Sequence, residues 1–148
     1  MAKSINISIK GLDIPDKLIK IVEEKANGGL EDVALDLIRV SSSITPYKTG
    51  KLSQSYKNKK TKSNGLDSYS ITYTARAKDG FNYARWTHNA NYNLGEGSKR
   101  RVPSKSKYSV KTFKVGKGYL ENTAQTLEKN YATHVGNKVK TALKRKVK

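Results

Sequence analysis

A short stretch, residues 46–55, joins two regions of different periodicity. Before it, apolar residues recur at spacings of three and four, as in a helix; after it, apolar and polar residues alternate, as in a strand. Pro46 disfavours helical backbone at Thr45, so the helix is expected to end there. Gly50 can adopt a positive φ in a tight turn, and Leu52 offers an apolar anchor to the core. The sequence therefore predicts a rigid corner between a helix and a sheet.

Three segments are expected before this corner. They are a strand over residues 4–10, a helix over residues 15–26 and a second helix over residues 30–43. In the strand, Ile5, Ile7 and Ile9 alternate with polar residues. The sequence Asn27-Gly28-Gly29 is expected to end the first helix, because glycine adopts left-handed backbone without strain. Serines 41–43 are interpreted as a polar last turn of the second helix, because no His or Lys base stands nearby to activate a hydroxyl.

The region after the corner predicts an antiparallel meander. Its strands are expected over residues 53–62, 66–76 and 81–87. The dipeptides Asn64-Gly65 and Asp79-Gly80 are hairpin turn signals between them. One face of the middle strand carries Tyr69, Ile71, Tyr73 and Ala75. The N-terminal strand or residues 108–115 are alternative additions to this sheet.

The last part of the chain is predicted to be a loop followed by a helix. Residues 88–107 are polar and rich in Asn and Gly, which is typical of a long loop. Apolar residues at helical spacing predict a helix over residues 119–144, about 40 Å long. Gly136 is expected to mark a bend or a close contact in that helix, and residues 144–148 to form a basic tail, frayed or docked.

These elements predict one α+β domain over residues 1–148. Its fold is expected to be an antiparallel β-meander of about three to five strands, packed against two N-terminal helices and a long C-terminal helix.

The net charge of +18 is unevenly distributed. Residues 1–40 carry six Lys or Arg against seven Asp or Glu, a net charge of −1, and residues 41–148 carry 24 against five, a net charge of +19. Such a field attracts polyanions or acidic protein surfaces. Lysines and arginines gather in three stretches: the first meander strand, the long loop with the residues up to 117, and the C-terminus. Tyr92 and Tyr108 flank the basic part of the loop. The candidate contacts to DNA or to a neighbouring subunit are Lys99, Arg100, Arg101, Lys105, Lys107, Lys111, Lys144 and Arg145.

Few side chains suggest catalysis. The chain has no cysteine, which excludes disulfides and thiolate metal sites. No apolar run approaches the ~20 residues that span a bilayer. His88 and His134 are interpreted as surface or loop residues, and the acids of the N-terminal helices as solvated charges. We therefore expect no catalytic residue, no metal, no cofactor and no enzymatic activity.

Three short motifs follow one another along the chain. Pro46, Thr49, Gly50, Leu52 and Ser55 form a Pro-x-x-Thr-Gly-x-Leu-x-x-Ser pattern, Tyr83-Ala84 follows, and Leu120 lies at the entry to the last helix. In their order and rough spacing these motifs resemble the signature of a family of small neck proteins of tailed bacteriophages, called tail-completion, head–tail joining or minor capsid proteins.

The resemblance implies a structural virion protein that connects the DNA-filled head to the tail. It implies a homo-oligomeric connector ring, six-fold with twelve-fold as the alternative, in the neck of the virion after assembly in the host cytoplasm. The expected partners are further copies of this chain, neighbouring neck, adaptor and tail-terminator proteins, and packaged DNA through nonspecific contacts, with no membrane. Residues 95–107 are then expected to be disordered in the monomer and ordered on assembly.

The alternative function is a basic module that binds nucleic acid without sequence specificity. It would use charge and aromatic rings, and its affinity would fall steeply with salt. The sequence contains no helix-turn-helix, zinc-finger or RNA-recognition signature.

Overall fold

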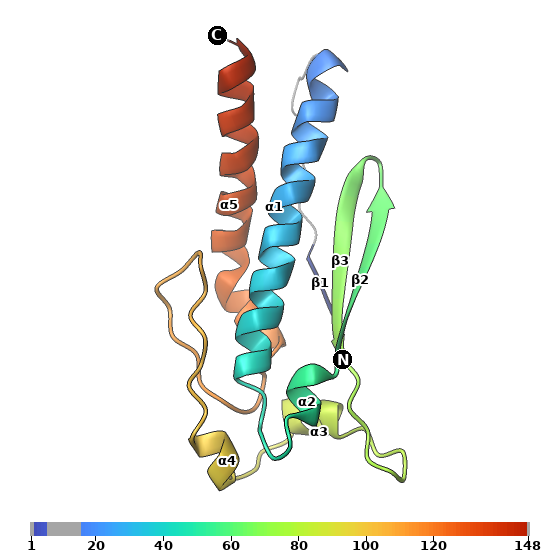
Figure 1. Ribbon diagram of the computed structural model, residues 1–148, viewed down its shortest axis with the longest axis vertical. Helices are drawn as coiled ribbons and strands as arrows, with labels where there is room; N and C mark the ends of the chain where they lie inside the picture. Colours follow the sequence, from blue (N-terminus) through green and yellow to red (C-terminus); the bar gives the residue numbers. More distant parts are fainter. Residues whose placement is uncertain (1, 6–15, 148) are drawn as a thin grey trace.

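The computed structural model describes residues 2–5 and 16–147, which form a sheet, a central helix and an outer helix (Figure 1). In chain order the elements are β1 (Ala2–Ile5), α1 (Asp16–Ser43), α2 (Lys51–Gln54), β2 (Tyr56–Ser63), β3 (Leu66–Tyr73), α3 (Tyr83–Asn89), α4 (Glu96–Lys99) and α5 (Glu121–Val147). The predicted class, α+β with an antiparallel sheet and a long C-terminal helix, is confirmed.

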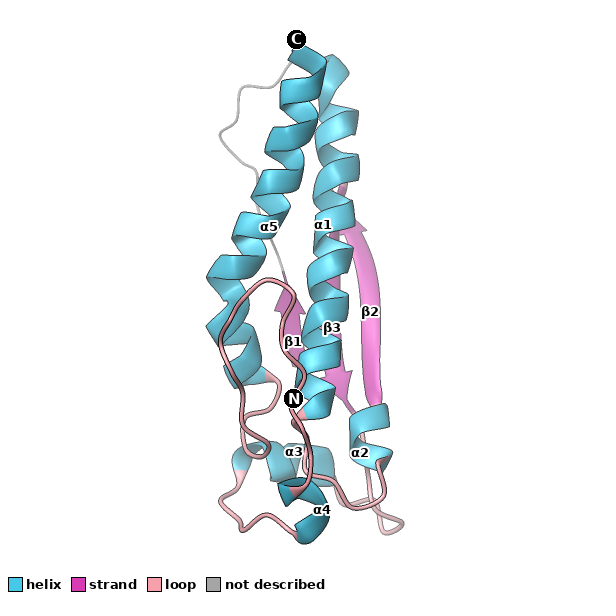
Figure 2. Cartoon of the chain, turned by 60° about the vertical axis from the view of Figure 1, so that its left-hand side comes forward, coloured by secondary structure: helices cyan, strands magenta, loops and turns pink. Residues whose placement is uncertain are grey.

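The layers are stacked sheet, α1, α5. The sheet has the strand order β1-β3-β2, and both pairings are antiparallel. α1 packs against β3 on one side and runs alongside α5 on the other (Figures 1 and 2). The short helices α2, α3 and α4 gather at one end of this elongated stack. Of the predicted N-terminal strand, residues 6–10 lie outside the described residues.

The prediction of two N-terminal helices is wrong, because α1 continues through Gly28 and Gly29. Each glycine costs about 1 kcal/mol relative to alanine in a helix. Burial on two sides outweighs that cost: Leu30 and Leu37, for example, are fully buried, and such side chains contribute about 1.5–3 kcal/mol each. Gly29 also has a packing role, since a Cβ atom there would lie 3.1 Å from the Cα of Val135 on α5. Gly29 therefore permits the close approach of the two helices.

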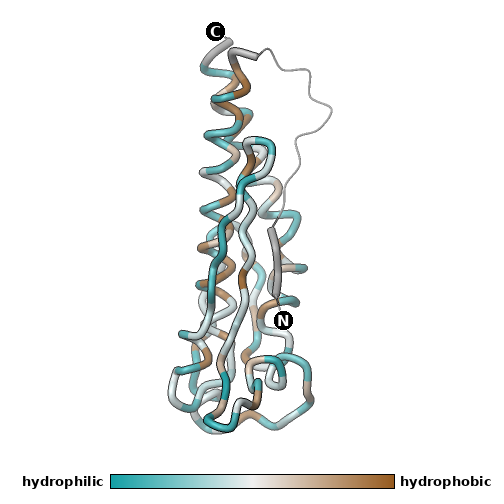
Figure 3. The backbone as a smooth tube through the Cα atoms, turned by 90° about the vertical axis from the view of Figure 1, so that its right-hand side faces the viewer, coloured by the Kyte–Doolittle hydropathy of each residue, from teal (hydrophilic) through white to brown (hydrophobic). Residues whose placement is uncertain are grey.

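The first predicted hairpin is confirmed. Asn64 and Gly65 have φ values of 52° and 80°, which suit the tight turn between β2 and β3. The residues predicted for one face of β3, Tyr69, Ile71 and Tyr73, are buried against α1 and the core. β2 is different, because all eight of its residues are exposed. Figure 3 shows this polar hairpin in front of the helices.

The second predicted hairpin is wrong. Gly80 has a φ of 89° and forms a turn, but the chain then enters α3 instead of a strand. The Asn82 side chain accepts a hydrogen bond from Arg85 N and caps this helix, and Ala84 and His88, four residues apart, bury the same face. Residues 108–115 form no strand, so the other proposed addition to the sheet is also wrong.

The predicted corner is confirmed in its main features. Gly50 has a φ of 83°, and Leu52 is only 5 % exposed. One helical turn, α2, follows Gly50 directly, so the strand begins at Tyr56 and not at residue 53 as predicted. α5 begins two residues after the predicted start and extends three beyond the predicted end. The expected contact at Gly136 is absent, because nothing lies within 4 Å of a Cβ added there.

The two glycines in the long helices predict opposite effects of one substitution. Gly29→Leu should lower the free energy of unfolding by about 1–3 kcal/mol, because the side chain must force α1 and α5 apart. The matched change Gly136→Leu should raise it by up to about 1 kcal/mol, because it meets open space. Urea denaturation measures both. Equal effects at the two positions would show that the close approach of the helices is not a constraint.

Candidate functional site

Five of the eight motif residues line one cavity at the end of the molecule where the short helices gather. The cavity has a volume of about 580 Å³. Its lining includes Pro46, Thr49, Gly50, Leu52 and Tyr83, together with residues 95–98 at the start of α4. Sequence segments that lie more than 30 residues apart therefore form the walls of a single hollow.

Polar contacts hold α4 against the corner. The Tyr47 backbone N donates to Ser98 Oγ at 2.8 Å. Gly97 permits this close approach, because a Cβ there would lie 2.7 Å from the Tyr47 carbonyl oxygen. Arg101 Nη1 donates to the carbonyl and hydroxyl oxygens of Thr45 at 2.8 and 2.9 Å, and its guanidinium lies 5.1 Å from the centre of the Tyr47 ring. The cavity thus has walls that are fixed by specific bonds.

The remaining motif residues, Ser55, Ala84 and Leu120, do not line the cavity. Ala84 and Leu120 are fully buried in the core. The Tyr119 hydroxyl, next to Leu120, donates to the Ala84 carbonyl at 2.8 Å and so links α3 to the start of α5. Ser55 Oγ donates to the Leu52 carbonyl at 2.8 Å and closes α2. These four residues stabilise α2, α3 and the start of α5 and are not part of the cavity lining.

His88 is buried, so its prediction as a surface or loop residue is wrong. Glu121 N donates to His88 Nε2 at 3.2 Å, which makes Nε2 the acceptor and assigns the ring proton to Nδ1. Nδ1 then donates to Asn89 Oδ1 at 2.9 Å. The imidazole therefore caps the first turn of α5. His134 lies partly exposed on α5, with Nε2 2.9 Å from Asp32 Oδ2, which Lys138 also contacts.

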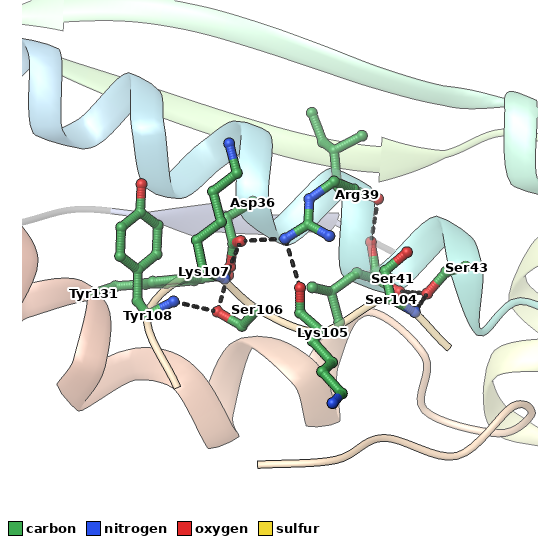
Figure 4. Close-up of polar contacts among 12 residues, drawn as sticks. Asp36, Arg39, Ser41, Ser43, Ser104, Lys105, Ser106, Lys107, Tyr108 and Tyr131 are labelled. Carbon is green, nitrogen blue, oxygen red and sulfur yellow. Dashed lines mark hydrogen bonds and ion pairs between the residues drawn. The ribbon is translucent and has the colours of Figure 1, made fainter. Parts of the chain in front are cut away.

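Asp36 on α1 is the centre of a buried polar network (Figure 4). Its carboxylate accepts hydrogen bonds from the backbone N of Lys107 at 2.9 Å, Ser106 Oγ at 2.6 Å, the Tyr131 hydroxyl at 2.8 Å and Arg39 Nη2 at 2.8 Å. Burial would raise the pKa of Asp36, but these four donors outweigh it and hold the pKa below the ordinary value. The interpretation of the acids as solvated charges is therefore wrong for Asp36.

The same network orders the long basic segment. Residues 104–108, which we name the strap, run alongside α1 (Figure 4). Arg39 Nη2 donates to the Lys105 carbonyl at 2.6 Å, and Ser104 N donates to Ser43 Oγ at 2.9 Å. Residues 88–107 contain the last two residues of α3 and the single turn α4, and the rest of this predicted loop has neither helix nor strand.

The candidate basic contacts do not form one patch. Lys99, Arg100, Lys105, Lys107 and Lys111 are exposed on α4, the strap and the segment that follows, whereas Arg101 turns inward. Lys144 and Arg145 are exposed near the far end of α5. The flanking tyrosines are engaged within the chain: the Tyr92 hydroxyl donates to the Thr87 carbonyl and its ring stacks on Trp86, and the Tyr108 ring packs on His134.

The site offers shape and hydrogen-bonding groups. The described residues contain no group of three or more His, Cys, Asp or Glu placed to hold a metal ion. Serines 41–43 donate to carbonyls of their own helix, as predicted for a polar last turn. None of the described helices has the length and apolar character to cross a membrane.

Comparison of the chain with protein-family models, with curated proteins and with solved structures found no match. The geometry of the cavity and the residues around it therefore carry the functional interpretation.

Arg101 and Arg100 provide a matched test of the cavity wall. Arg101→Met should lower the free energy of unfolding by about 1–2 kcal/mol, because it leaves the buried Thr45 oxygens without their donor. It should also speed hydrogen exchange in residues 45–50. Arg100→Met removes the same charge from an exposed side chain and should change stability by less than about 0.5 kcal/mol. Indistinguishable variants would contradict this role for Arg101.

Asp36 predicts a particular dependence of stability on pH. Its folded-state pKa lies below the ordinary value of 3.8, so its contribution is complete above that pH and is lost as the pH falls through the folded-state value. Asp36→Asn should cost about 1–3 kcal/mol at pH 6, and the difference from wild type should narrow below pH 3.8. Urea denaturation at several pH values measures it. Glu128→Gln, at an exposed position on α5, should leave the profile unchanged, and a constant difference for Asp36→Asn would refute the prediction.

Proposed function

We propose that this protein is a structural component of the neck of a tailed bacteriophage, where a homo-oligomeric ring of the chain connects the DNA-filled head to the tail. The cavity at the end of the molecule is the docking point for a neighbouring neck, adaptor or tail-terminator protein. The ring is six-fold, with twelve-fold as the alternative, and it functions within the virion.

One observation carries the proposal. Four of the motif residues that resemble the neck family, Pro46, Thr49, Gly50 and Leu52, come from the α1–α2 corner, and Tyr83 comes from α3, yet all five line the same cavity. A motif that served only a local turn would have no reason to collect at one place in the fold. Shared position around a preformed hollow is what a docking site requires.

The distribution of charge supports contacts between copies. The exposed acids Glu24 and Glu31 lie on α1, whereas residues 41–148 carry a net charge of +19. Contact between these exposed acids of one copy and the basic region of the next would favour head-to-tail association, which closes into a ring when the rotation between copies permits.

Loss of the gene tests the role in the virion. A phage without this protein should yield DNA-filled heads and complete tails that lie unjoined in electron micrographs of the lysate. Normal virions would refute the neck function and favour the basic nucleic-acid-binding module instead.

Complementation with two matched variants tests the cavity. Thr49 lines the cavity and is exposed, so Thr49→Trp should fill the hollow without disturbing the core, and should abolish head–tail joining. Thr133 is exposed on α5, and Thr133→Trp should restore joining as the wild type does. Particle counts by electron microscopy give the readout, with the amounts of folded protein compared by immunoblot and thermal melting. Joining by Thr49→Trp would show that the cavity is not the docking point.

A further inference from the structure

The β2–β3 hairpin has a polar face that the sequence motifs do not include. Residues paired across two strands lie on the same face of a sheet. Tyr69, Ile71 and Tyr73 of β3 are buried on the side of α1, so the alternate residues of β3 and their partners on β2 point to the opposite side. This outer face includes Lys57, Lys59, Thr61, Ser68, Ser70 and Thr72, with the pair Ser63 and Leu66 next to the turn.

The outer face carries positive charge without a balancing acid. The only acid in β2 or β3 is Asp67, which lies on the inner face and is 6 % exposed. Asp67 contacts Lys60 at 3.5 Å and Lys62 at 3.9 Å, both also on the inner side. Lys57 and Lys59, in contrast, form no ion pair with any described residue. They lie among four hydroxyl side chains.

No described element covers this face. Every residue of β2 is exposed, and β2 forms one edge of the sheet. In Figure 3 the hairpin lies toward the viewer with both long helices behind it. A strand exposed on both faces contributes little apolar burial to folding. Its lysines and hydroxyls therefore have no evident role in the core.

The chemistry of the outer face favours one class of partner. Protein interfaces are enriched in aromatic residues, Met and Arg and depleted of Lys and Ser, and the outer face has none of the enriched types. Contacts to DNA phosphates use Lys, Ser and Thr side chains. Two residues of a strand rise by about 7 Å, whereas successive phosphates of one DNA strand advance by about 3.4 Å along the helix axis and are farther apart along the winding backbone, so two lysines at this spacing can reach separate phosphates. Lys57 and Lys59 thus have the spacing to follow a phosphate backbone.

We propose that the outer face of the β2–β3 hairpin binds the phosphate backbone of double-stranded DNA without reading its sequence. In the neck it would be the surface that meets the packaged genome. The inference rests on the proposed neck function only for the place where the protein meets DNA. The binding chemistry of the outer face does not depend on the neck function.

The strap and its neighbours are a weaker candidate for this contact. Arg101 points toward Thr45, and the backbone of Lys105 and Lys107 is tied to α1. The nearby tyrosine rings are packed against other side chains of the chain. The backbone of the strap is thus already engaged by α1, whereas Lys57 and Lys59 of the outer face form no ion pair with any described residue.

The test is binding of a fluorescein-labelled duplex of about 30 base pairs, followed by fluorescence anisotropy over a range of salt concentrations. The double variant Lys57→Gln/Lys59→Gln should bind about 10- to 100-fold more weakly near 0.1 M salt, with a log–log salt slope shallower by about 2. The matched variant Lys105→Gln/Lys114→Gln loses the same charge from exposed side chains and should bind like the wild type. Equal losses in the two variants, or no loss in the first, would overturn the proposal.

Weaker binding could also come from a misfolded variant, so a variant that is expected to bind more tightly is needed as well. Ser70→Lys adds a third cation to the outer face, on β3 and opposite Lys59. It should tighten DNA binding by about 3- to 10-fold near 0.1 M salt and make the salt dependence steeper. Circular dichroism confirms that each variant is folded. Unchanged affinity in folded Ser70→Lys would count against this face.

Two further measurements separate the possible failures. Poly-L-glutamate at matched charge should compete poorly with the duplex; equal competition that depends on Lys57 and Lys59 would assign the face to acidic proteins and overturn the DNA proposal. The binding assay uses the isolated chain, so it does not depend on the neck function. If the phage without the gene yields unjoined heads and tails but the isolated chain does not bind DNA, the neck function stands and the DNA proposal fails. If the chain binds DNA through this face but the phage without the gene yields normal virions, the DNA proposal stands and the neck function fails.

Discussion

Burial of α1 between the sheet and α5 is the interaction on which the rest of the structure depends. β3 lies on one side of this helix and α5 on the other, so α1 contributes to the core in both directions. The close approach at Gly29 and Val135 sets the distance to α5. Asp36 and Thr45, in α1 and just after it, then provide the polar groups that hold the strap and the segment beyond α4. Without α1, neither the sheet nor α5 would have the helix against which it packs.

Polar contacts between distant segments connect this core to the candidate site. The buried carboxylate of Asp36 is satisfied by donors that lie up to 95 residues away in sequence. Arg101 and Ser98 hold α4 against the corner, and Tyr119 links α3 to α5. A cavity whose walls are fixed in this way is ready to receive a partner without an ordering cost. That property suits a structural connection between large assemblies, which is the function we propose.

Much of the fold could be predicted where one local pattern had a single interpretation. The turn at Asn64-Gly65, the inner face of β3 and the apolar side of α5 follow from periodicity and turn chemistry. The motif residues around the cavity were also identified in advance, although their assembly was not. His88 was misassigned because the partners of its ring, Tyr119 and Glu121 N, lie more than 30 residues later in the chain. No local signal distinguishes such a histidine from an exposed one.

The sequence by itself determined the α+β class, the corner at Gly50 and the unequal charge, because these depend on residue type and near neighbours. Tertiary structure decided the rest. α1 passes through Gly28 and Gly29 because burial on two sides outweighs the helix propensity of two residues. Residues 83–89 fit either a short strand or a short helix, and the Asn82 cap with the buried face of α3 selects the helix. Asp36 becomes a buried anchor because the strap and α5 bring donors to it, which only packing in three dimensions can arrange.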